Sequence, residues 1–137
     1  MFGFLKKKKK KTAAIITIAV ELLQIQISMG DAEDNHSFKV RLTDKYSRGY
    51  IVGFCDAIFQ SAGIQDDAEE TALLEVIHTA LFGEGTGAKI VEQSYQDKEK
   101  ETFTKGLMKG GQDLVEYSRN GTPRMSLTRY LLNGEIQ

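Results

Sequence analysis

The stretch that decides the fold class is residues 12–29, TAAIITIAVELLQIQISM. Its many isoleucines would suit a strand, but its polar residues fall at i, i+4, i+7 and i+11, one stripe of a helix: Thr17, Glu21, Gln24 and Ser28. The rest of the circumference is apolar apart from Gln26. A helix of this kind belongs at the centre of a bundle or in a subunit interface. We therefore predict a mostly buried first helix, capped by Thr12 and ended by Gly30.

Two further helices follow from apolar spacing and end signals. An apolar face advances by four residues from Phe38 to Ile58, which predicts a helix over about 38–62, closed by Gly63. Asp66 precedes Glu69 by three residues, the spacing of a capping box, and Gly83 provides a stop. A third helix is therefore expected between Asp66 and Gly83.

The last part of the chain is also predicted to be helical. Apolar residues recur through 88–118, but the charged run 97–101 leaves open whether this region is one helix or two. Thr122 and Pro123 predict the start of a short final helix that ends near Gly134. The sequence thus predicts an all-α fold, a compact bundle of five or six helices in a single domain, 12–137, preceded by a basic N-terminal tail, 1–11.

The charge of the chain is divided unevenly along its length. The net charge is −1, but Lys6–Lys11 supply six of the 18 basic residues. The remainder holds 12 basic and 19 acidic residues, a net charge of −7. An acidic body repels nucleic-acid phosphate, so nucleic-acid binding is not expected.

The basic tail is the most unusual feature of the sequence. It joins apolar residues to a lysine run that would suit an anionic membrane surface: Phe2, Phe4, Leu5, Lys6, Lys7, Lys8, Lys9, Lys10 and Lys11. The alternative is a tail that stays in solvent or folds over the acidic body. Glu21 and Gln24 interrupt the apolar run that follows, which argues against a signal peptide or a membrane span. We expect a cytoplasmic protein, peripheral at the inner membrane face if the tail binds.

Small residues four apart form a seam along the predicted second helix: Gly49, Gly53, Ala57 and Ser61. Such a seam lets another helix backbone approach closely, and glycine inside a helix otherwise costs about 1 kcal/mol relative to alanine. Gly106 and Gly110 repeat the pattern in a shorter form. The seam can serve packing within one chain or a homodimer.

The sequence offers no catalytic or metal-binding constellation. Cys55 lies beside an apolar face and is interpreted as a small buried residue, while His36 and His78 have no nucleophile or ligand at a useful spacing. The acidic segment 31–37 lacks the glycine and the final glutamate of a calcium loop. The Gly-rich turn 83–87 lacks the spacing of a phosphate-binding loop. We expect no enzyme activity, no cofactor and no metal.

These features favour a non-catalytic helical interaction, adaptor or regulatory protein. The apolar first helix predicts a homodimer, and the tail predicts peripheral contact with an anionic membrane. The alternative is a ligand-binding or enzymatic helical domain whose pocket forms only in three dimensions.

Overall fold

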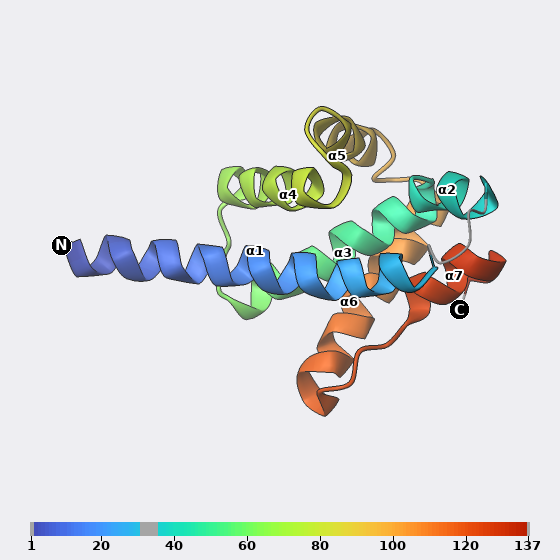
Figure 1. The fold of residues 1–137 in the computed structure, drawn as a ribbon. Helices are drawn as coiled ribbons and strands as arrows, with labels where there is room; N and C mark the ends of the chain where they lie inside the picture. The colour runs from blue at the N-terminus through green and yellow to red at the C-terminus, as the bar shows by residue number, and fades with distance from the viewer. Residues whose placement is uncertain (1, 31–35, 137) are drawn as a thin grey trace.

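A computed structural model describes residues 2–30 and 36–136, and these fold entirely as helices and their connections (Figure 1). The all-α prediction is confirmed, although the described residues form seven helices rather than five or six. In chain order they are α1 (Phe2–Gly30), α2 (His36–Leu42), α3 (Lys45–Ser61), α4 (Asp67–Phe82), α5 (Thr86–Gln96), α6 (Glu101–Asn120) and α7 (Ser126–Asn133).

One break that was not predicted, and one that the sequence left open, account for the seven helices. The helix expected over 38–62 is divided because Asp44, in an extended conformation, accepts a hydrogen bond from the Ser47 amide and starts α3 there. The charged run divides the region expected over 88–118 into α5 and α6. Arg48 of α3 holds this connection through a 2.7 Å contact between its Nη2 and Asp97 Oδ2, and the hydrogen bond lowers the pKa of Asp97.

The predicted ends of α4 agree with the structure, whereas only one of the two predicted ends of the final helix does. Asp66 caps α4 by accepting from the Glu69 amide at 3.1 Å, and the chain leaves α4 at Gly83 with φ of 91°, as expected. The final helix ends at Gly134, also as expected, but begins at Ser126. The prediction that it starts at Thr122 and Pro123 is therefore wrong, because the chain after Gly121 runs without helical structure through 122–125.

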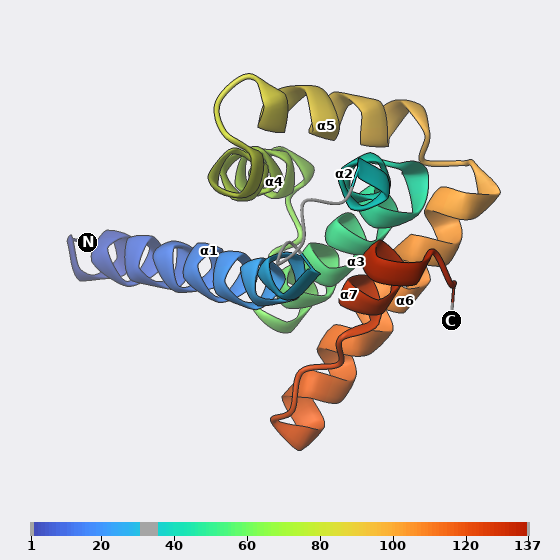
Figure 2. The ribbon, with the colours of Figure 1, turned by 45° about the vertical axis from the view of Figure 1, so that its right-hand side comes forward.

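The centre of the fold is the crossing of α3 and α6, which make the most extensive contact between any two helices described (Figure 2). At this crossing glycines face the opposite backbone. A Cβ atom on Gly49 or Gly53 would collide with the carbonyls of Phe103 and Leu107. Gly106 and Gly110 stand in the same relation to α3, against the Tyr46 and Tyr50 carbonyls. The backbones of α3 and α6 are thus in direct contact, without side chains between them.

Helix α1 is continuous from Phe2, so Thr12 lies inside it and does not cap its start. Lysine is a good helix former and no proline interrupts the segment, which lets the lysine run continue the helix. The predicted polar stripe is exposed, as expected. The buried face is one narrow line: Ile15, Ala19, Leu23 and Gln26. The prediction that the first helix is mostly buried is wrong for the single chain.

Gln26 anchors α1 directly to α3 and α7, although it is polar. Its side chain is 2% exposed; Nε2 donates to Tyr50 Oη at 3.0 Å, and Oε1 accepts from the Leu127 amide at 3.0 Å. Its carbonyl accepts from Thr128 Oγ1 at 2.7 Å. Tyr50 Oη donates in turn to Asp113 Oδ2 at 2.6 Å. The network ties the C-terminal half of α1 to α3, α6 and α7.

Candidate functional site: the basic end of helix α1 and the adjoining cleft

The N-terminal part of α1 projects beyond the other helices, while its C-terminal half lies across the body (Figures 1 and 2). Lys7–Lys11 lie in the projecting part, and all five residues are exposed. Consecutive residues of a helix are separated by about 100° around its axis, so these five lysines surround it. The result is a rod with positive charge on every side.

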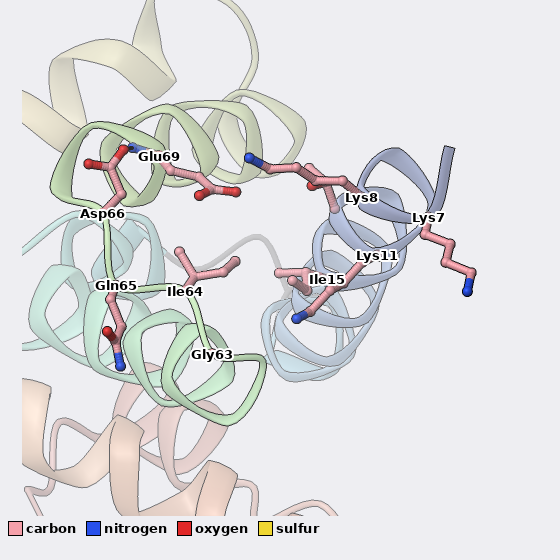
Figure 3. A pocket seen from close by; sticks show the side chains of 10 residues that line it. Lys7, Lys8, Lys11, Ile15, Gly63, Ile64, Gln65, Asp66 and Glu69 are labelled. Atoms are coloured by element: carbon pink, nitrogen blue, oxygen red, sulfur yellow. Dashed lines mark hydrogen bonds between the residues drawn. The ribbon is translucent and has the colours of Figure 1, made fainter. Parts of the chain in front are cut away.

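A cleft of about 460 Å³ separates this rod from the start of α4 (Figure 3). Lys8 and Lys11 stand on the α1 wall, and Asp66 and Glu69 stand on the opposite wall. Figure 3 shows the Lys8 side chain extending toward Glu69, whereas Lys7 points away from the cleft. The two walls carry opposite charge, so the body of the protein competes with any anionic partner for the lysines that face it.

The floor of the cleft is apolar. Ile15 of α1 and Ile64, in the turn between α3 and α4, are both buried and face one another there (Figure 3). Both side chains belong to the hydrophobic core, which extends here between α1 and the turn that leads into α4. The cleft therefore combines two charged walls with a small apolar base.

Several carboxyl groups lie close together at the start of α4, around the acidic wall. Burial, followed by repulsion from Asp56, Asp67 and Asp66, raises the pKa of Glu70 above its ordinary value. Like charges disfavour the ionised form of a carboxyl group, whereas nearby lysines favour it. The basic end of α1 thus lies beside the part of the body with which it has an electrostatic attraction.

A second surface of α1 is apolar and lacks a cover within the described residues. Ile18, Ile25 and Met29 are 46%, 47% and 64% exposed, and Leu22 between them is half-buried. These residues stand at i, i+4, i+7 and i+11, so they form one stripe along the helix, which we call the apolar stripe. It lies between the buried face and the polar stripe, which it adjoins where Ile25 follows Glu21 by one helical turn.

The structure places the remaining predicted site residues as follows. The backbone of Phe2, Phe4, Leu5 and Lys6 belongs to α1, and their side chains lie outside the described part of the structure. Gly49 and Gly53 contact α6 at the centre of the fold, while Ala57 is half-buried and Ser61 is exposed. The predicted seam and the basic segment are therefore separate features.

Sequence reasoning missed the acidic wall and the cleft floor. The capping signal located Asp66 and Glu69 on α4 but did not indicate that α1 passes beside them. A signal was present on α1, because Lys8, Lys11 and Ile15 recur at the spacing of one helix face. Nothing in the sequence identified Ile64 as their partner.

The residues considered for catalysis lie elsewhere and apart. Cys55 is fully buried, as expected, and burial followed by the charge of Asp56 raises its pKa to about 12. His78 is fully buried in α4. Within residues 2–30 and 36–136, no group of three or more histidine, cysteine, aspartate or glutamate side chains is placed to hold a metal ion. The acidic segment considered as a calcium loop falls largely on residues 31–35, outside the described residues.

Comparison with known proteins gives no relative, since no protein-family model, no characterised protein and no solved structure matches the chain.

Proposed function

We propose that this protein is a non-catalytic helical interaction protein that attaches to anionic membrane surfaces through the projecting end of α1. The observation that carries the proposal is the exposure of Lys7–Lys11 on every side of a helix that projects from the body. A lysine close to an anionic bilayer contributes about 1 kcal/mol, so five of them give on the order of 5 kcal/mol at low salt. The apolar residues before them, Phe2 among them, add contact with the interface.

Attachment at the surface is favoured over crossing. Lys7–Met29 is long and apolar enough to span a bilayer by length and composition alone. However, Leu23 is fully buried and Gln26 hydrogen-bonds to α3 and α7. A span would have to break these contacts and place a glutamine and Glu21 in lipid, which is costly. In the described part of the projecting end, the side chains of Lys7–Lys11 make no hydrogen bond to another helix.

The test is co-sedimentation of the full chain with vesicles of phosphatidylserine and phosphatidylcholine, or of phosphatidylcholine alone. The variant replaces Lys7, Lys9 and Lys10 with glutamine. The matched control replaces three exposed lysines elsewhere with the same loss of charge: Lys89, Lys100 and Lys105. We expect the first variant to lose about 3 kcal/mol of binding, roughly a hundredfold, and the control to bind nearly as the wild type does.

Salt and lipid composition complete the test. Raising the ionic strength should release the wild-type protein, because the Debye length shortens to about 3 Å at 1 M salt. Wild-type protein that ignores phosphatidylserine vesicles at low salt overturns the proposal. Equal losses in the two triple variants would also overturn it, because net charge and not α1 would then govern binding.

The apolar stripe of α1 favours a second candidate function, self-association. We propose a homodimer in which the stripe of one chain packs against that of a second copy. Ile18, Ile25 and Met29 are large apolar side chains at the spacing used by helix pairs, and burial of each is worth about 1.5–3 kcal/mol. The basic end of α1 stays available for a membrane in such a dimer.

A further inference from the structure

A pocket that opens to solvent on one side lies in the body of the protein and has the properties of a ligand site. It measures about 160 Å³ and lies where α3, α4, α5 and α6 converge. Its walls are mainly apolar: Val52, Leu74, Val91, Phe103 and Leu107. Tyr95 and Lys98, both exposed, stand at its edge and leave a route to solvent. Small-molecule sites combine apolar walls with a few polar groups in this way.

The polar group that gives this pocket its chemistry is His78. The ring is fully buried, and its Nδ1 lies 2.7 Å from the carbonyl oxygen of Leu74. A carbonyl only accepts, so Nδ1 carries the proton, and Nε2 of the neutral ring presents a lone pair. Nε2 is buried and has no hydrogen-bond partner among the described residues.

Ser94 lines the same pocket and adds a second acceptor. Its hydroxyl donates to the Ile90 carbonyl at 2.8 Å, which leaves only lone pairs for a ligand. The buried polar groups of the pocket thus accept hydrogen bonds and offer none. A ligand matched to them has an apolar body and a donor at its inner end.

The volume of the pocket limits the size of the apolar part of the ligand. Apolar cavities of about 150 Å³ hold one benzene ring. We infer that the pocket between α3, α4, α5 and α6 binds a small aromatic molecule with a hydroxyl group, of the phenol class, which donates to His78 Nε2. This site is independent of α1 and of membrane attachment.

The experiment compares phenol with toluene, which has nearly the same shape but no donor, by NMR titration of the full-length protein. We expect saturable binding of phenol, with toluene bound about tenfold more weakly, the equivalent of one hydrogen bond. The ¹⁵N signal of His78 Nε2 should move with phenol and stay in place with toluene.

Two variants test the contribution of the apolar walls and that of the hydrogen-bond acceptor separately. Val52→Phe places an aromatic ring where a small aliphatic side chain lines the cavity and should abolish binding of both compounds. His78→Phe keeps a ring but removes the acceptor, so phenol should then bind no better than toluene. If His78→Phe does not fold, the wild-type comparison still decides. No saturable phenol binding would overturn the inference, as would equal affinities for phenol and toluene in the wild type.

Discussion

The amide of Gln26 in α1 donates to the hydroxyl of Tyr50 in α3, with 3.0 Å between Nε2 and Oη. The same hydroxyl donates to Asp113 of α6, so one phenol joins three helices that are distant in sequence. Burial, followed by the charge of Asp113, raises the pKa of Tyr50 far above its ordinary value, so the hydroxyl keeps its proton. This contact fixes the C-terminal half of α1 on the body and leaves the basic end to project.

Replacement of Tyr50 by phenylalanine should therefore destabilise the fold. It keeps the ring but leaves the Gln26 amide and the Asp113 carboxylate without their shared partner, at a cost of about 1–3 kcal/mol each. Denaturant unfolding measures this loss. Tyr95→Phe is the control, because the Tyr95 hydroxyl contacts Thr71 at an exposed position and its removal should change stability by less than about 0.5 kcal/mol. Equal effects of the two changes would contradict a special role for Tyr50.

Two glycine variants test the crossing of α3 and α6. Gly53→Ala places a Cβ atom against the Leu107 carbonyl and should cost about 3 kcal/mol, the upper end for overpacking. Gly111→Ala meets only the Gly53 carbonyl oxygen at 3.6 Å, an ordinary contact, and should gain up to about 1 kcal/mol from helix propensity. Thermal melts measure both. A Gly53→Ala protein as stable as the wild type would show that the two backbones can separate without cost.

The homodimer is tested at Ile25. Ile25→Glu places a charge in the centre of the apolar stripe, where the side chain is exposed in the single chain. We expect light scattering to give a dimer for the wild type and a folded monomer for this variant, because a buried unpaired charge disrupts an interface. Gln24→Glu adds the same charge on the exposed polar stripe and should leave the dimer intact. A monomeric wild type rules out the dimer.

The acidic wall of the cleft gives a prediction for membrane binding. Glu69→Gln removes a negative charge that faces Lys8 across the cleft, while the amide of residue 69 still donates to Asp66. The lysines then have less competition, so binding to phosphatidylserine vesicles should strengthen by a few-fold at low salt. Glu92→Gln, an exposed change of equal charge on α5, is the control. Identical strengthening by both variants would assign the effect to net charge.

Acid should destabilise the protein through His78. Burial lowers its pKa below the ordinary value of 6.5, so the unfolded chain binds the proton first. The contribution of neutral His78 is present above about pH 6.5 and is lost as the pH falls toward the lower pKa of the folded state. When the pH is lowered from about 7.5 to about 5, the free energy of unfolding should fall less for His78→Asn than for the wild type. His36→Asn, at an exposed position of α2, should decline as the wild type does.

The sequence predicted the fold class and several helix ends because these depend on local patterns. The spacing of Thr17, Glu21, Gln24 and Ser28 identified an exposed stripe, and Asp66 and Gly83 marked the ends of α4 correctly. Asp44 was not recognised as a cap, because its apolar surroundings continue the helical spacing on both sides. Only the hydrogen bond to the Ser47 amide shows that the helix begins again there.

Tertiary relationships were harder to predict. The glycine pairs of α3 and α6 were noticed separately, but nothing local indicates that they face one another. The burial of α1 was overestimated because apolar residues in a sequence do not show how much of a helix surface is covered by other helices. Gln26, the exception in the apolar surface, is the residue through which α1 binds the body. The pocket at His78 draws on four helices, and no spacing in the chain reveals such a site.

The anchoring of Gln26 has a consequence during synthesis. Its partner Leu127 follows it by 101 residues, so α1 leaves the ribosome well before α7 exists. At about 5–20 residues per second the interval lasts on the order of 5–20 s. Throughout it, a helix as apolar as a membrane span lacks one part of its native surroundings, because α3 and α4 emerge earlier but α7 does not. We therefore expect the apolar surface of α1 to be open to other contacts until translation reaches the last helix, and a slower rate of elongation to lengthen that interval.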